Sequence, residues 1–443
     1  MATLRIVYVL SIVLFVAGCE KIDLVKGQLQ QTPHEAYSEA LNKAGLDETE
    51  LGRRWFSTAE SALNNSLYVQ LPYEETGWFA PNEVRAFVWD FSVRKGQQLT
   101  VELETPPENR GAIFVDLFVA QSEDNIDHIA SLEKGKQSLD YIVQDDAKYL
   151  LRLQPELLAG GRYELRITLS PSLAFPVEGK DSSAIGSAFG DPRDGGSREH
   201  HGVDIFAPKG TKAVAASNGI VYRTGVTPRG GKVVWLMDRD LGQSYYYAHL
   251  DEITVRQGTY VKAGDPLGYV GNTGNASFTP PHLHFGIYES FSGPVDPFHF
   301  IHDLGETVEQ TQIANGELPS TLTVTANRLR LREGPSTKAS ILTDLERHTI
   351  LRAVAKTGNW YRVILPNGQE GYVSAQYVDV TKNPIDEIQL ARSRSVLATP
   401  TSSSPEIGRI PPGDRVKLYG RLGGFRYVKL PSGQFGWIDL NRS

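Results

Sequence analysis

The chain has 443 residues, more than a single hydrophobic core usually accommodates, so we expect several domains. With 40% hydrophobic and 22% charged residues, its composition is that of a globular protein and excludes the collagen-like and intrinsically disordered classes. The formal net charge of −7 argues against nucleic acid as a partner, and we expect no such partner.

The first 18 residues predict an export signal. Arg5 precedes an apolar stretch, residues 6–17, that is too short to span a bilayer comfortably and fits a signal-peptide core. Cys19, the single cysteine, ends the sequence VAGC, which resembles a bacterial lipobox. The resemblance implies cleavage before Cys19, lipid on this residue, and an extracytoplasmic protein tethered to a lipid bilayer. Glu20 favours the periplasmic face of the outer membrane; an ordinary signal peptide with a chance cysteine is the alternative.

Residues 19–66 are predicted to form a polar tether followed by a helical segment. PHEAYSEALNKAGL (33–46) and ETELGRRWFSTAESAL (48–63) combine good helix formers with helical spacing of apolar residues. From Leu67 the pattern changes to short alternating segments separated by turn residues, which predicts a β-sandwich over residues 67–175. This domain has no cluster of ligand-type residues, so we interpret it as a spacer or a binding module.

Half of the ten histidines fall between residues 200 and 284, in three separate pieces of sequence. These pieces are REHHGVDIFAP (198–208), YYYAHL (245–250) and PPHLHFGIY (280–288). Strand alternation places His282 and His284 on one face and Leu283 on the other, so both imidazoles point into the same space. Two converging histidines indicate a metal site, an acid/base pair, or both.

The spacing around His200 adds a possible carboxylate ligand. Asp204 follows His200 after three residues, in a segment whose glycine and β-branched residues favour a loop running into a strand. The helical zinc motif H-E-x-x-H is absent from the sequence. Two histidines and one carboxylate, with a fourth position open to water, form a standard ligand set for catalytic zinc.

Together with GTKAVAASNGIV (210–221) and GNTGNAS (271–277), the three pieces resemble the lysostaphin/LytM-type peptidoglycan zinc metallopeptidases. The resemblance, placed over residues 184–305, implies a small antiparallel β-sheet (a duplicated hybrid motif) that bears a groove. It also implies one zinc ion per chain. The implied zinc ligands are His200, Asp204 and His284, and the implied catalytic residues are His249 and His282.

Two alternatives remain within this predicted site. His201 adjoins His200 and is its rival for the first ligand position, but the H-x-x-x-D spacing favours His200, and we expect His201 to point elsewhere or to shape the groove. Either His249 or His282 could act as the general base, because the pKa of a free imidazole is near neutrality. The tyrosines at 245–247 alternate in direction, and at least one of them is expected to belong to the core.

The C-terminal part contains an internal repeat. YRVILPNGQEGYV (361–373) and RYVKLPSGQFGWI (426–438) share a pattern at an offset of 65 residues, each with an Asn-Gly or Ser-Gly hairpin turn. The first copy, residues 320–381, resembles a bacterial SH3-like domain, and the second, residues 385–443, is divergent. We therefore expect two small SH3-like β-barrels, which either bind cell-wall peptides or serve as packing modules. Residues 319–443 carry 18 basic and 10 acidic side chains, which suits attachment to an anionic polymer or simply a solvated surface.

The sequence thus predicts a mainly β, multidomain protein. The function that the resemblance implies is zinc-dependent hydrolysis of peptide stems or cross-links in bacterial peptidoglycan, by an endopeptidase tethered through a lipidated Cys19. A non-catalytic wall-binding scaffold, or an activator of cell-wall amidases, is the alternative. A toxin aimed at competitors fits poorly with a lipid anchor. The sequence makes no prediction of oligomeric state.

Overall fold

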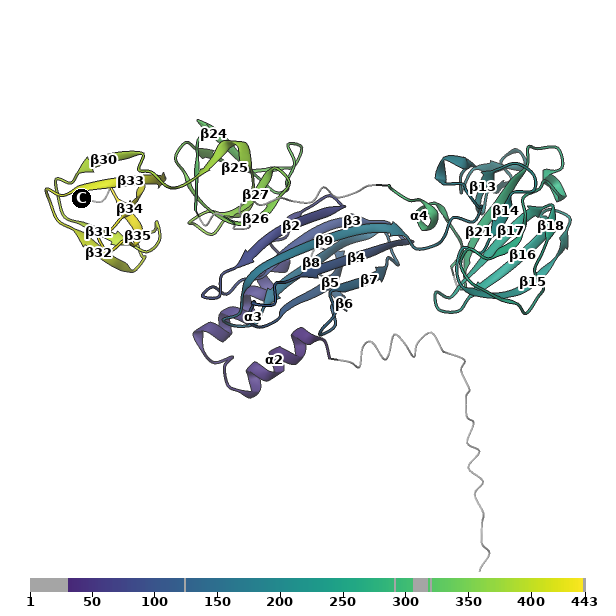
Figure 1. Ribbon diagram of the computed structural model, residues 1–443, viewed down its shortest axis with the longest axis horizontal. Helices are drawn as coiled ribbons and strands as arrows, with labels where there is room; N and C mark the ends of the chain where they lie inside the picture. The colour runs from purple at the N-terminus through teal and green to yellow at the C-terminus, as the bar shows by residue number, and fades with distance from the viewer. Residues whose placement is uncertain (1–30, 123–124, 291, 306–317, 319–320, 441–443) are drawn as a thin grey trace, which may run out of the picture.

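The computed structural model describes residues 31–122, 125–290, 292–305, 318 and 321–440. Cys19 and the predicted signal segment lie outside these residues. No helix in the described ranges is both long enough and apolar enough to cross a membrane. The chain is mostly β and folds into several sheets, as the sequence predicts (Figure 1).

Two helices precede the first strands, where the sequence predicts them: α2 (Pro33–Lys43) and α3 (Glu50–Leu63). A capping box starts α2, because the Thr32 side chain accepts from the Glu35 backbone N–H while the Glu35 carboxylate accepts from that of Thr32. Trp55 of α3 is 1% exposed and donates from Nε1 to the Pro155 carbonyl at 2.9 Å. This buried indole fixes the helix to the neighbouring sheet.

A β-sandwich follows, with its core between two sheets. One sheet has the order β1-β3-β8-β5-β6, and the facing layer has the order β2-β9-β4-β7. Buried aromatic and aliphatic side chains of both sheets fill the space between them. The strands are β1 (Leu67–Tyr68), β2 (Tyr73–Phe79), β3 (Phe87–Val93), β4 (Gln97–Glu104), β5 (Ile113–Ser122), β6 (Asn125–Ser131), β7 (Ser138–Ile142), β8 (Ala147–Pro155) and β9 (Gly161–Pro171).

The segment that carries the clustered histidines forms an antiparallel sheet of its own, in the order β10-β13-β21-β17-β16-β15-β19, with β22 paired to β21. Buried side chains such as Leu283 and Phe285, both 0% exposed, form the core under one face of this sheet. The elements are β10 (Ile185–Ser187), β11 (Pro192–Arg193), β12 (Arg198–Glu199), β13 (Val203–Phe206), β14 (Lys212–Val214), β15 (Gly219–Thr227), β16 (Gly231–Asp238), β17 (Gln243–Leu250), β18 (Glu252–Ile253), β19 (Tyr260–Val261), β20 (Pro266–Tyr269), β21 (His282–Glu289), β22 (Gly293–Val295) and α4 (Phe298–Ile301).

Both repeat copies form sheets in which three successive strands pair in order. In the first copy β26, β27 and β28 pair, and in the second β33, β34 and β35 pair. The strands are β23 (Leu322–Val324), β24 (Arg328–Arg332), β25 (Ile341–Glu346), β26 (Ile350–Thr357), β27 (Trp360–Ile364), β28 (Glu370–Ser374), β29 (Val378–Val380), β30 (Asp386–Gln389), β31 (Arg394–Leu397), β32 (Glu406–Ile410), β33 (Arg415–Leu422), β34 (Phe425–Lys429) and β35 (Phe435–Asp439).

The expected closed barrels differ from the observed pairing. Among the described residues, the strands of both copies form open sheets. In the first copy, β26 also pairs with β2 of the sandwich through Thr76–Lys356 and Gly77–Ala355. This strand addition joins the first copy and one sandwich layer into an eleven-stranded sheet. The backbone groups of β26 at this edge therefore pair with β2 of the sandwich.

A buried ion pair accompanies this junction. Arg362 of β27 is 1% exposed, and its Nη1 lies 3.5 Å from Glu75 Oε1 of β2. Its guanidinium also lies over the rings of Phe87, at 4.0 Å, and Trp89, at 4.5 Å. The sandwich and the first repeat copy therefore share a desolvated charged contact as well as a sheet.

Candidate metal centre

Neighbouring strands bring the predicted ligands together. β13 pairs with β21 in a register that sets Asp204 directly opposite His284, and β17 pairs with the other edge of β21. His284 and His282 share one face of β21, while Leu283 lies in the core on the other face. His200 comes from the loop between β12 and β13. The predicted alternation along this strand is confirmed.

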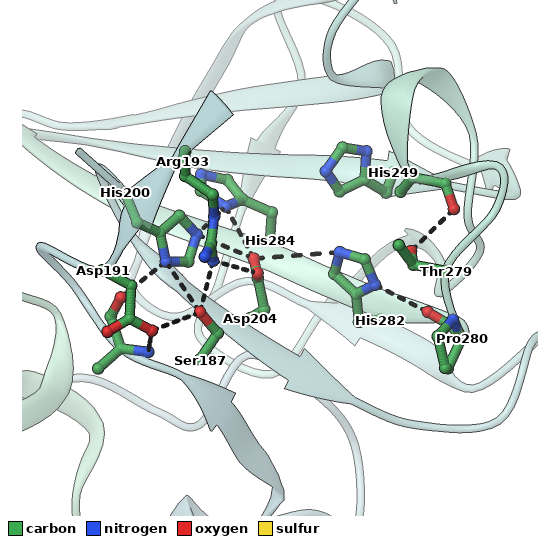
Figure 2. Close-up of polar contacts among 12 residues, drawn as sticks. Ser187, Asp191, Arg193, His200, Asp204, His249, Thr279, Pro280, His282 and His284 are labelled. Atoms are coloured by element: carbon green, nitrogen blue, oxygen red, sulfur yellow. Dashed lines mark hydrogen bonds and ion pairs between the residues drawn. The ribbon is translucent and has the colours of Figure 1, made fainter. Parts of the chain in front are cut away.

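Three ligand atoms converge on one point (Figure 2). His200 Nε2 lies 3.0 Å from Asp204 Oδ1 and 2.9 Å from His284 Nδ1, and His284 Nδ1 lies 3.0 Å from Asp204 Oδ1. Gly202 makes this approach possible, because a Cβ there would lie 2.4 Å from the Phe285 carbonyl oxygen and 2.9 Å from the His284 ring. In the described part of the chain, these three residues form the group of histidine, cysteine and acidic side chains that could hold a metal ion.

His249 and His282 lie beside this cluster, on the opposite side of Asp204 from His200 and Arg193 (Figure 2). The two rings are 5.0 Å apart between centroids, and His282 Nε2 is 4.0 Å from Asp204 Oδ1. His249 adopts a left-handed backbone conformation, with φ of 63°, which is uncommon for a residue other than glycine. The exposed His201 does not join the cluster and stacks near Phe189 instead, with 6.4 Å between ring centroids.

Backbone carbonyls set the tautomers of three of these histidines. The Nδ1 atom of His200 lies 2.7 Å from the backbone carbonyl oxygen of Ala188. The Nδ1 atoms of His249 and His282 each lie 2.8 Å from a backbone carbonyl oxygen. A carbonyl oxygen only accepts, so each Nδ1 carries a proton and donates it. In the neutral ring, the lone pair is therefore on Nε2. This arrangement suits His200 as a ligand and leaves a proton-accepting nitrogen on each of the other two rings.

The surroundings of Asp204 favour its ionised carboxylate. Burial by itself would raise the pKa of Asp204, but the hydrogen bonds and charges of His200 and His284 outweigh it and hold the pKa well below its usual range. Burial lowers the pKa of His249 to about 4, and it also lowers the pKa of His284. At neutral pH His249 is consequently uncharged and able to accept a proton.

A supporting network at the site was missed by the sequence reasoning. Arg193 of β11 donates from Nη2 to Asp204 Oδ2 at 3.0 Å and to the Ser187 hydroxyl. Asp191 accepts from that hydroxyl at 2.8 Å, while its own carbonyl accepts from the His200 N–H at 2.9 Å. These contacts hold the outer oxygen of Asp204, so that Oδ1 faces the two histidines. No local pattern marks Arg193, because its partner lies on another strand.

The donor set fits a zinc ion. Two imidazole nitrogens and one carboxylate oxygen are the atoms that zinc takes from proteins, and each ligand here is fixed by a further hydrogen bond or a neighbouring strand.

Comparisons with known proteins identify two kinds of domain in this chain. Residues 198–297 match peptidase family M23, and residues 327–379 match the bacterial SH3 domain. Over 110 residues the chain is 38% identical to lysostaphin of Staphylococcus simulans, which covers 24% of this chain and 22% of lysostaphin. Over 125 residues it is 35% identical to an L-Ala--D-Glu endopeptidase of Bacillus subtilis, which covers 26% of this chain and 38% of that protein.

Among solved structures, the catalytic domain of lysostaphin from S. simulans is 37% identical and covers 26% of this chain and 89% of its own, with a TM-score of 0.24. The match to the curated lysostaphin spans about a fifth of that protein's length. The sequence matches, which include the segment that carries Asp204, His249 and His284, identify the two kinds of domain. This chain contains a peptidase family M23 domain followed by a bacterial SH3 domain.

Proposed function

We propose that this chain is a zinc-dependent endopeptidase that hydrolyses peptide stems or cross-links of bacterial cell-wall peptidoglycan. The observation that carries the proposal is the convergence of His200, Asp204 and His284 within 4.8 Å, beside two further histidines. The M23 match and the likeness to peptidoglycan endopeptidases support it. When bound, zinc supplies Lewis acidity at the three ligands.

The remaining roles belong to His249 and His282. Each ring donates its Nδ1 proton to a backbone carbonyl and keeps Nε2 free to take up a proton and pass it on. The lowered pKa of His249, about 4, keeps its ring neutral at pH 7, the form that accepts a proton. We assign proton transfer, from the attacking water and to the leaving amine, to this pair of histidines.

Attachment to the envelope belongs to the same proposal. The first SH3 domain and its divergent repeat would hold the enzyme on its polymeric substrate and raise its local concentration there. A lipidated Cys19, facing the periplasm from the outer membrane, would add a second tether.

Purified peptidoglycan tests the enzymatic proposal directly. We expect the zinc-loaded protein to release fragments with new amino termini, and mass spectrometry of these fragments would identify the bond that is cut. Removal of metal with a chelator should stop the release, and about one equivalent of zinc should restore it. Intact peptidoglycan after incubation with the zinc-loaded protein would contradict the proposal.

The supporting arginine gives a separate prediction. Arg193→Ala should weaken zinc binding by about 10- to 100-fold, because Asp204 would lose the partner that orients it. Arg193→Lys, which keeps one charged donor, should recover part of the loss. Zinc affinity can be measured by competition with a chromogenic chelator, with circular dichroism to verify the fold. Equal affinities of the alanine variant and the unsubstituted protein would contradict this role.

A further inference from the structure

The turn between β15 and β16 lies next to His249. The His249 backbone N–H donates to the Gly230 carbonyl at 2.7 Å, and the Asn275 N–H donates to the Arg229 carbonyl at 3.0 Å. The turn is thus fixed both to a proposed catalytic residue and to the loop that follows β20. The side chain of Arg229 is exposed.

Four aromatic rings, which we name the aromatic platform, lie on the same sheet: Tyr222, Trp235, Tyr246 and Tyr288. Tyr246 meets His284 edge-on, at 5.8 Å between centroids, and lies 4.4 Å from Trp235. Trp235 in turn lies 5.1 Å from Tyr288 and 6.0 Å from Tyr222. All four are half-buried, whereas Tyr245 and Tyr247 are 0% exposed in the core. The platform therefore continues from a proposed metal ligand across β17, β16 and β15, which are neighbours in the sheet (Figure 1).

Two arginines border the platform, Arg223 within β15 and Arg229 in the turn that follows it. Arg223 is opposite Trp235 in the strand register, and Tyr246 reaches the turn, since a Cβ on Gly230 would lie 2.1 Å from the Tyr246 hydroxyl. Burial raises the pKa of Tyr246, while the positive charges of Arg223 and Arg229 oppose the rise. Arg229 directly precedes Gly230, so it borders the platform where the Tyr246 hydroxyl meets the turn. Both side chains are exposed, and neither has an ion-pair partner among the described residues, in contrast to Arg193.

We propose that the aromatic platform, Arg223 and Arg229 form a subsite for a carboxylate-bearing residue of the peptide substrate. A guanidinium binds a carboxylate through two parallel charged hydrogen bonds, and the aromatic faces can cover the aliphatic part of the same residue. The inference rests on the proposed function and narrows it: the chain should favour acidic stem peptides over uncharged glycine bridges.

Two matched peptides test the subsite with the full-length, zinc-loaded protein. One is a synthetic stem peptide with free side-chain carboxylates, and the other is the same peptide with these groups converted to carboxamides. We expect the double variant Arg223→Gln/Arg229→Gln to lose about tenfold or more in kcat/KM on the carboxylate peptide, mainly through KM. Cleavage of the carboxamide peptide and the zinc content should stay unchanged.

Arg239→Gln is the matched control, because Arg239 is an exposed arginine just beyond the other end of β16. Equal losses on both peptides, or no loss on either, would overturn the subsite. The affinity of the metal-free protein for each peptide can be measured by tryptophan fluorescence. This binding measurement distinguishes a wrong subsite from a protein that does not cleave peptides at all. If the unsubstituted protein binds the carboxylate peptide more tightly and the double variant does not, the subsite is supported even without cleavage. If the unsubstituted protein binds both peptides equally well, the subsite is overturned.

Discussion

His284→Ala should abolish both zinc binding and peptidoglycan cleavage. The Nδ1 atom of His284 lies 2.9 Å from His200 Nε2 and 3.0 Å from Asp204 Oδ1, so its removal leaves two ligand atoms where three converge. Loss of a residue that only supports a ligand lowers metal affinity by up to roughly 100-fold. Because His284 is itself a proposed ligand, we expect a larger fall in zinc affinity. Zinc content after dialysis and fragment release from peptidoglycan would measure the two effects.

His201→Ala is the matched control for this prediction. His201 adjoins His200 in sequence, but its exposed ring lies outside the cluster. We expect this variant to retain zinc and activity close to those of the unsubstituted protein. Loss of zinc from the His201 variant, together with its retention by His284→Ala, would show that the ligands are assigned incorrectly.

Arg362→Ala should destabilise the chain by about 3–5 kcal/mol, because it leaves Glu75 buried without its cation. Glu75 is 0% exposed, and the hydroxyl groups of Tyr73 and Tyr163 both donate to its carboxylate. Burial raises the pKa of Glu75, and the Arg362 charge opposes this rise. Urea unfolding can be followed by tryptophan fluorescence, since Trp89 lies 4.5 Å from the guanidinium.

A control variant and a compensating double variant test this stability prediction further. Arg409→Ala removes an exposed ion pair with Glu406 in the second repeat copy and should leave the stability close to that of the unsubstituted protein. Combining Arg362→Met with Glu75→Gln should recover part of the loss, because the buried Glu75 then carries no charge, whereas the part-buried Glu370 still loses its Arg362 partner. If Arg362→Ala costs no more than Arg409→Ala, the junction between the sandwich and the first SH3 domain contributes little to stability.

This junction also bears on how the SH3 domain works. An edge strand that pairs with β2 is not available to add a peptide strand from the cell wall. A wall ligand of this domain would therefore not bind by strand addition at the edge of β26 that pairs with β2. The first SH3 domain therefore packs against the sandwich through a shared sheet and a buried ion pair.

The sequence by itself determined the features that depend on local pattern. Alternation along residues 282–288 predicted which side chains share a face, and it placed His282 and His284 together opposite the buried Leu283. Helical spacing likewise predicted α2 and α3. Such patterns suffice because backbone geometry alone sets the periods of strands and helices.

Only the tertiary structure decided the contacts between distant segments. It brought His200 into the cluster and left His201 outside, and it placed Arg193 against Asp204. It also used an edge strand of the first SH3 domain to extend the sandwich, whereas the sequence predicted a small SH3-like β-barrel with no link to the sandwich. Strand register and loop position depend on packing between residues far apart in the chain, and no local spacing records which partner a side chain meets.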